Sequence, residues 1–173
     1  EEAKRRAFEY MAEHNEGATP RQIAYILTGH YHQTKAMEEV KALQPYVESF
    51  VRTNDTDILK YDAELYFMQG VASLMLFNYE KSEIEFKRVL DEFPDSHQES
   101  NALYWYAASK LYLQKYADAW PVFEQYISKF PEGEWLDEAY FQGGISLFGM
   151  EDYVAASNRF SLVIERFPES GVY

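Results

Sequence analysis

The chain has 173 residues, enough for one ordinary domain. It has no cysteine, which excludes disulfides, thiolate zinc sites and a cysteine nucleophile. With 16 basic and 29 acidic residues its formal net charge is −13, so we expect no nucleic-acid partner and weak attraction to anionic membranes. No apolar run approaches the roughly 20 residues of a membrane-spanning helix, so direct membrane insertion is not expected.

Residues 1–61 are predicted to form helices that precede a series of repeats. Residues 3–14 are typical of one helix, and 20–32 of a second helix with Thr19 as its N-cap. The segment 44–51, QPYVESFV, resembles the segment 120–127, WPVFEQYI, which lies inside the repeats. We therefore interpret 20–54 as a degenerate repeat, and the charged start without an initiator Met as that of a processed or partial chain.

Three copies of a 37-residue unit follow, at 63–99, 100–136 and 137–173. The dipeptide Phe-Pro marks the period, at Phe93-Pro94, Phe130-Pro131 and Phe167-Pro168. Other rows keep the same spacing: Gly70/Ala107/Gly144, Tyr79/Tyr116/Tyr153, Ser82/Ala119/Ala156 and Phe86/Phe123/Phe160. Several rows at one period indicate a repeat architecture, which we expect to be one continuous solenoid together with 1–61.

Within each unit the apolar spacing predicts two antiparallel helices, near 62–77 and 79–92 in the first copy. A small residue, Gly70 or its counterpart, is expected where the two helices cross, and the Phe row is expected to be buried. Phe-Pro should end the second helix, because the residue before proline is disfavoured in the α region. Pro121 is placed in the first turn of its helix, where proline is tolerated. The fold class is therefore all-α, with no strands.

This pattern resembles the tetratricopeptide repeat family over residues 63–173. The resemblance rests on the small-residue, Tyr, Phe and Pro rows, with Tyr66, Leu103 and Tyr140 opening the motif. It implies a right-handed superhelix of stacked antiparallel helical hairpins. The longer unit of 37 residues, closed by Phe-Pro, is similar to repeats of bacterial cell-envelope proteins such as the Tol-Pal system coordinator and the outer-membrane assembly lipoprotein. That likeness favours a periplasmic or cell-envelope location over a cytoplasmic one.

No sequence motif for catalysis or cofactor binding is present, so we expect no enzyme activity, no cofactor and no metal site. His30 and His32 are two residues apart, so on a helix their side chains diverge by about 200° and chelate one metal poorly. Adjacent acidic pairs such as Asp137 and Glu138 also diverge, which is typical of a solvated face rather than of a catalytic dyad.

The resemblance implies that the first helix of each repeat lines a concave groove. The candidate partner-binding residues on these helices are Glu64, Phe67, Val71, Met75, Tyr104, Trp105, Tyr112, Glu138, Phe141 and Phe148. Tyr and Trp are favoured at interfaces because they offer large contact areas at a small entropy cost. The alternative for each of these side chains is that it only packs against the neighbouring repeat.

Charge suggests the kind of partner. Residues 1–61 carry a net charge of −2 and residues 62–173 a net charge of −11. An acidic surround would steer a basic, partly apolar peptide or protein into the groove, although acidity also serves solubility alone. We predict a non-enzymatic protein-interaction scaffold; the alternatives are a self-associating structural element and the non-catalytic helical domain of a larger envelope protein or enzyme.

The last repeat suggests how such self-association could occur. We expect its outer face to be partly uncovered, so that the chain is a segment of a longer array or forms a homo-oligomer through this end. The residues expected on this face are Phe148, Val154, Leu162 and Val163.

Overall fold

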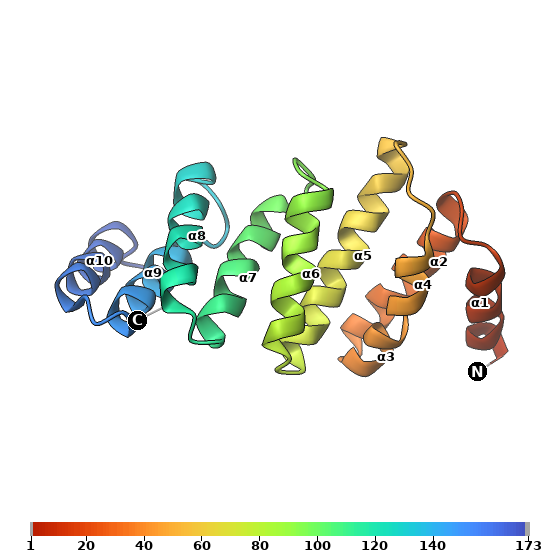
Figure 1. Cartoon of the computed structure of the whole chain (residues 1–173), viewed down its shortest axis with the longest axis horizontal. Helices are drawn as coiled ribbons and strands as arrows, with labels where there is room; N and C mark the ends of the chain where they lie inside the picture. Colours follow the sequence, from red (N-terminus) through yellow and green to blue (C-terminus); the bar gives the residue numbers. More distant parts are fainter. Residues whose placement is uncertain (1, 172–173) are drawn as a thin grey trace. The chain divides into compact units, whose positions relative to one another are not determined.

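The computed structural model describes residues 2–171, and within that range it contains ten α-helices and no strand (Figure 1). The all-helical prediction is thereby confirmed. The helices are α1 Glu2–Glu13, α2 Ala18–Gln33, α3 Met37–Ala42, α4 Gln44–Ser49, α5 Thr56–Met75, α6 Tyr79–Glu92, α7 Glu99–Tyr112, α8 Tyr116–Lys129, α9 Leu136–Gly149 and α10 Tyr153–Arg166. They form two compact units that divide between Gln98 and Glu99, here called the N-terminal and C-terminal units. Whether the chain is one continuous solenoid remains a prediction.

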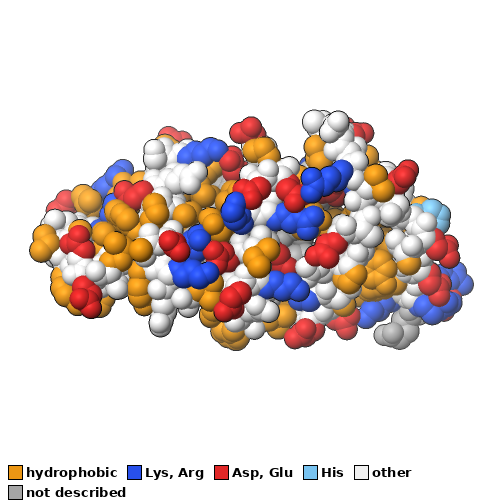
Figure 2. All heavy atoms as spheres, viewed as in Figure 1, with side chains coloured by type: hydrophobic (Ala, Val, Ile, Leu, Met, Phe, Trp, Pro, Cys, Tyr) orange, Lys and Arg blue, Asp and Glu red, His pale blue; other side chains and the backbone are white. Residues whose placement is uncertain are grey.

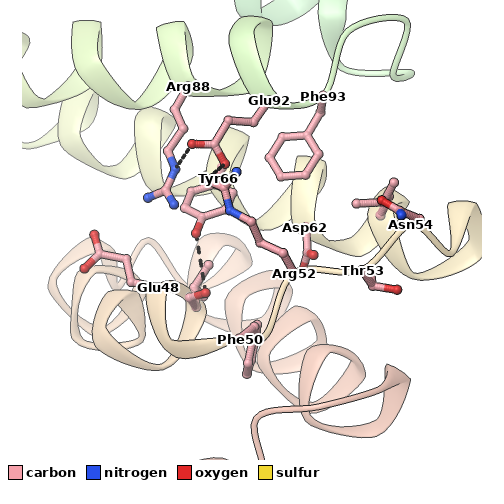
Figure 3. Close-up of a pocket in the computed structure, with 12 residues that line it drawn as sticks. Glu48, Phe50, Arg52, Thr53, Asn54, Asp62, Tyr66, Arg88, Glu92 and Phe93 are labelled. Atoms are coloured by element: carbon pink, nitrogen blue, oxygen red, sulfur yellow. Dashed lines mark hydrogen bonds and ion pairs between the residues drawn. The ribbon is translucent and has the colours of Figure 1, made fainter.

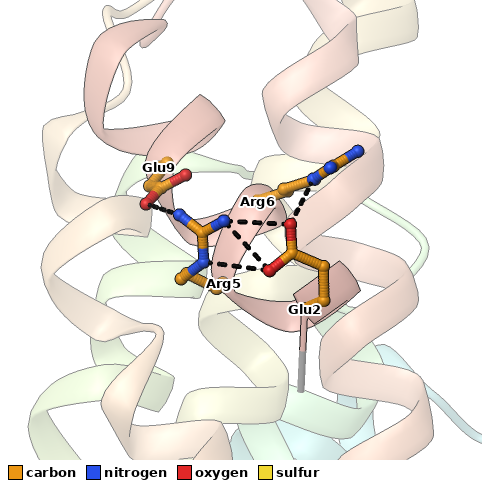
Figure 4. Close-up of polar contacts among 4 residues, drawn as sticks. All are labelled: Glu2, Arg5, Arg6 and Glu9. Carbon is orange, nitrogen blue, oxygen red and sulfur yellow. Dashed lines mark hydrogen bonds and ion pairs between the residues drawn. The ribbon is translucent and has the colours of Figure 1, made fainter.

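Helix α1 agrees with the helix predicted at 3–14. Its exposed side carries a cluster of ion pairs (Figure 4), in which Arg5 bonds Glu2 at 2.9 Å and Glu9 at 2.5 Å. Arg6 also contacts Glu2, at 2.7 Å. Pairs spaced three or four residues apart on an exposed helix contribute only a few tenths of a kcal/mol each. The cluster therefore supports the local helix and explains little of the fold.

The start of α2 differs from the prediction. The N-cap is Gly17, which has a φ of 74°, and Thr19 lies inside the helix. The positive φ favours glycine, and the Arg21 side chain fixes this turn by donating to the Gly17 carbonyl oxygen at 2.9 Å. A pattern of capping residues alone could not reveal this contact.

Two short helices, α3 and α4, stand where the degenerate repeat was expected to have one second helix. They join at Leu43, and Pro45 lies in the first turn of α4. Proline has no N–H to donate and is best tolerated at such a helix start, so it favours a new helix here over continuation of α3.

Two largely buried ion pairs connect the irregular region, helices α2 to α4, to the first regular hairpin, α5–α6. Arg21 on α2 bonds Asp62 on α5 at 2.7 Å, and Lys41 on α3 bonds Glu85 on α6 at 2.5 Å. Burial raises the pKa of Asp62, against the effect of Arg21, and lowers the pKa of Lys41, against the effect of Glu85. Both pairs connect residues more than forty positions apart within the N-terminal unit.

Three helical hairpins follow, α5–α6, α7–α8 and α9–α10. Helix α6 has the predicted bounds, whereas α5 begins before the predicted residue 62 because the Asp55 side chain caps it by accepting from the Asp57 N–H at 2.9 Å. Each hairpin turns through a residue with a φ near +60°, namely Phe77, Gln114 or Glu151. These residues lie at one repeat position, so the same turn recurs.

Gly70 and Gly144 of the small-residue row lie where the two helices of their hairpins meet, as predicted. A Cβ on Gly70 would lie 2.7 Å from the Phe86 ring, and one on Gly144 would lie 2.5 Å from the Phe160 ring, so a larger residue at either position would force the ring to shift. Phe86 and Phe123 are fully buried, in agreement with the predicted core. Phe160 is only half-buried, because among the described helices α10 packs chiefly against α9.

The Phe-Pro pairs end the second helices. Phe93, Phe130 and Phe167 are the C-caps of α6, α8 and α10, with φ values of −131°, −126° and −129°. All three residues have thus left the α region, as a following proline favours. The placement of Pro121 was wrong: α8 begins at Tyr116, so this proline lies in the second turn and the helix continues through it with one donor fewer.

Candidate functional site

The ten predicted partner-binding residues all lie on the first helices of the regular hairpins, α5, α7 and α9. Three of them are exposed: Met75 on α5, Tyr112 on α7 and Phe148 on α9. Six are half-buried: Glu64, Phe67, Val71, Trp105, Glu138 and Phe141. The residues on α5 belong to the N-terminal unit and the others to the C-terminal unit, so we treat the face of each unit separately.

Tyr104 is the one candidate that lies in the core, with 3% of its surface exposed. Its ring stacks on Trp135 with centroids 5.1 Å apart and meets Trp105 edge-on at 5.0 Å. Burial raises its pKa well above the ordinary value, so the phenol stays neutral. Replacing Tyr104 is therefore expected to destabilise the C-terminal unit, and it does not test partner binding cleanly.

Trp135 was missed by the sequence analysis, although it organises this aromatic cluster. Its indole Nε1 donates to Asn101 Oδ1 at 2.9 Å, and its backbone N–H donates to the Tyr126 hydroxyl at 3.0 Å. These bonds fix the turn before α9 against α7 and α8. The cluster holds the half-buried Trp105 at the surface of α7.

Phe67 and Phe141 occupy equivalent positions and connect the surface to the core. Each ring lies 5.5 Å from the ring of the core phenylalanine of its own hairpin, Phe86 or Phe160. Part of each side chain thus serves packing within its own hairpin, whereas the alternative interpretation expected packing against the neighbouring repeat. The rest of each side chain is exposed, and the assignment of Phe67 and Phe141 to a binding face stays a prediction.

In the N-terminal unit, a hollow of about 400 Å³ opens between α2 and α5. It is lined by Tyr25, Ile26, Thr28, Gly29, His30, Gln33, Glu64 and Met68, and we call it the α2–α5 hollow. Of these residues the sequence analysis named only Glu64 as a binding residue. Five of the others, Tyr25, Ile26, Thr28, Gly29 and His30, lie in the helix predicted at 20–32, the first helix of the degenerate repeat, where no binding residue was sought.

The two acidic candidates are not free negative charges. Glu64 Oε2 accepts from the Nε2 atoms of both His97, at 2.8 Å, and Gln98, at 2.6 Å. Burial, together with a hydrogen bond to Asp137, raises the pKa of Glu138 to about 7. Although burial opposes it, hydrogen bonds with Glu138 and Ser170 lower the pKa of Asp137. Near neutral pH Glu138 therefore contributes less negative charge to the acidic surround than the sequence count suggests.

A second cavity of about 260 Å³ lies in the N-terminal unit among α4, α5 and α6 (Figure 3). Glu92 is held there by Arg88 at 2.9 Å and by Arg52 at 3.0 Å, and the Arg88 guanidinium lies 4.0 Å from the Tyr66 ring centroid. Burial raises the pKa of Tyr66 to about 12. The cationic groups of this cavity are already paired, so the arrangement favours a structural role.

The described part of the chain, residues 2–171, holds no cluster of histidine and acidic side chains arranged to bind a metal ion. Nor is any of its helices both long and apolar enough to cross a membrane. On the face drawn in Figure 2, acidic and basic side chains are interspersed with apolar ones. That face shows no continuous acidic rim.

Comparison with known proteins identifies the fold. Residues 101–133, which cover most of α7 and α8, match the family model described as tetratricopeptide repeat. No curated protein sequence matches the chain significantly. Among solved structures, MamA from Desulfovibrio magneticus RS-1, residues 41 to the end, is 20% identical with a TM-score of 0.69, covering 87% of this chain and 77% of that one. YrrB, described as a TPR protein with an unusual peptide-binding site, is 19% identical with a TM-score of 0.63, covering 94% and 75%.

Identities at this level establish the fold and nothing more about function. The matched structures agree with the helical hairpins seen in α5–α10, and the family-model match falls within the repeat predicted at 100–136. None of these comparisons shows the more specific likeness to the Tol-Pal system coordinator or the outer-membrane assembly lipoprotein. Residues 101–133 thus match the tetratricopeptide-repeat family model, and the chain has the helical-hairpin fold that MamA and the TPR protein YrrB share.

Proposed function

We propose that this protein is a non-enzymatic scaffold that binds a protein or peptide partner through the faces of its first helices. The observation that carries the proposal is the exposure of large apolar side chains there: Met75 on α5, and Tyr112 and Phe148 on α7 and α9. Aromatic and methionine side chains are enriched at such interfaces. The fold supports the proposal, because YrrB, which shares it, is described as having a peptide-binding site.

A preformed helical array suits this role physically. Its binding face is ordered before the partner arrives, so association costs less conformational entropy than it would for a flexible surface. The net charge of −11 over 62–173 favours a basic, partly apolar partner, mainly through its rate of association. Because the pKa of Glu138 is raised to about 7, this charge effect should depend on pH near neutrality.

Binding to peptides selected from a displayed random library tests the proposal in the C-terminal unit. Phe148→Ser is expected to weaken a selected peptide about tenfold, because it removes an exposed apolar contact from α9. Ile164→Ser is the matched control, since Phe148 and Ile164 are both 57% exposed but Ile164 lies on α10. Equal losses in both variants, or no selectable peptide, would contradict the proposal.

Self-association is the second candidate function, and it rests on a different surface. Tyr153, Val154, Leu162 and Ile164 on α10 are all exposed. Val163, which was expected on this outer face, is instead buried in the hairpin, because it points toward α9. Sedimentation at increasing concentration separates the candidates: a dimer that Val154→Ser and Ile164→Ser disrupt together would favour self-association.

A periplasmic or cell-envelope location is part of the proposal. Its support is the likeness of the 37-residue unit, closed by Phe-Pro, to repeats of bacterial envelope proteins. Fractionation of the native cells with an antibody against this chain tests it. Recovery only in the cytoplasmic fraction would contradict it.

A further inference from the structure

We propose that the α2–α5 hollow binds a peptide segment through one large, uncharged apolar side chain of that segment. The inference rests on the proposed function and assigns to it a particular site and ligand chemistry. Four features of the hollow carry it: its exposed apolar lining, an open glycine, an unpartnered hydroxyl and the absence of a free charge.

The first feature is the lining. Tyr25 and Ile26 are adjacent on α2, and both are exposed, Ile26 by 68%. Met68 of α5 lines the same hollow and is half-buried. Apolar surface left in water is unfavourable, at about 25 cal/mol per Å². A ligand side chain seated against these three residues would remove such surface from water.

The second feature is Gly29, in the interior of α2. A glycine there destabilises a helix by about 1 kcal/mol relative to alanine. At Gly70 and Gly144 packing explains the glycine, because a Cβ at either position would collide with a phenylalanine ring. At Gly29 a Cβ would meet no atom within 4 Å, so packing in the described chain does not require glycine. The open space over this backbone lies in the hollow and can admit a ligand.

The third feature is Thr28, which also lines the hollow and is 1% exposed. Its Oγ1 is buried and has no hydrogen-bond partner among residues 2–171. Leaving such a group unsatisfied costs about 1–3 kcal/mol, and most buried hydroxyls are bonded. Rotation of this side chain toward the hollow would let its hydroxyl bond with a backbone amide of a bound peptide.

The fourth feature is charge. The lining contains no lysine or arginine, and its one carboxylate, Glu64, already accepts from His97 and Gln98. His30 is the only other titratable group in the lining apart from the Tyr25 phenol. A ligand carboxylate would lose its hydration here and meet no cation in the lining, and a ligand ammonium would have to share Glu64 with His97 and Gln98. The complementary anchor is therefore an uncharged apolar side chain, such as that of leucine or phenylalanine.

Three variants of the full chain test the proposal, with peptides selected from a displayed random library as the probe. Gly29→Leu should fill the hollow and weaken binding about tenfold or more, while leaving thermal stability equal or higher because leucine favours helix. Ile26→Ser should also weaken binding. Ile84→Ser is its matched control, because Ile84 on α6 is 67% exposed and lies outside the hollow.

The expected result is a set of peptides that share an uncharged apolar anchor and lose affinity for Gly29→Leu and Ile26→Ser but not for Ile84→Ser. Peptides that bind wild type and Gly29→Leu equally would overturn the inference and leave the proposed function standing. Selected anchors that are lysine or arginine would overturn it too, as would a dimer of the chain that Gly29→Leu abolishes. Failure to select any peptide would contradict both proposals.

Discussion

Replacing Arg21 by methionine is expected to destabilise the N-terminal unit by about 3–5 kcal/mol, as when one partner of a buried ion pair is removed. The Arg21 guanidinium is 1% exposed and donates to Asp62 Oδ1 at 2.7 Å. It also donates to the carbonyl oxygens of Gly17, at 2.9 Å, and Val51, at 2.7 Å. Methionine keeps much of the volume, but it leaves a buried carboxylate and two carbonyl oxygens without their donor.

Urea unfolding followed by far-ultraviolet circular dichroism measures the loss. The three tryptophans all lie in the C-terminal unit, so their fluorescence reports that unit in the same samples. Arg52→Met is the control, because that side chain is 80% exposed and its pair with Glu92 should contribute less than about 1 kcal/mol. Arg21→Met with Asp62→Leu should recover much of the stability. A single Arg21→Met variant as stable as Arg52→Met would refute the reasoning.

Three further outcomes follow from the structure. Phe123→Ala should lower the free energy of unfolding by about 3–5 kcal/mol in tryptophan-detected urea melts. Phe160→Ala should lower it clearly less, because Phe160 is half-buried, and equal losses would contradict the assigned core. Phe77→Gly should raise thermal stability by about 1 kcal/mol, as should Gln114→Gly, because both residues have a φ near +60°; a loss of stability in both would refute this. Because the pKa of Glu138 is raised to about 7 from its ordinary 4.5, the folded state binds more protons than the unfolded state between these values, so stability should fall as pH rises from about 4.5 to about 7. Glu138→Gln should remove this slope, and an unchanged slope would count against the assigned shift.

The regular hairpins were predictable because one period places the same residue types at every contact. Gly70 and Gly144 meet their phenylalanine partners at the same crossing, and Phe-Pro ends each second helix. The 37-residue spacing therefore predicted the bounds of α6, the ends of the second helices and the burial of Phe86 and Phe123. The turn residues were not predictable, because Phe77, Gln114 and Glu151 have little in common except their positive φ.

The irregular region was less predictable because long-range polar contacts determine it. Arg21 fixes Gly17, Val51 and Asp62 together, and no local pattern in the sequence indicates such a contact. The burial of Tyr104 also depends on Trp135, which comes from the turn between α8 and α9. Position within the repeat thus placed the candidate residues on the first helices, but it did not show which of these side chains are covered.

Hydrogen exchange of the full chain with a selected peptide bound tests the central claim most directly. We expect the peptide to slow amide hydrogen exchange in the first helices: α2 and α5 of the N-terminal unit, or α7 and α9 of the C-terminal unit. Amide hydrogen exchange in the second helices α6, α8 and α10 should stay unchanged. Protection confined to α6, α8 or α10 would contradict the claim that the first-helix faces bind the partner.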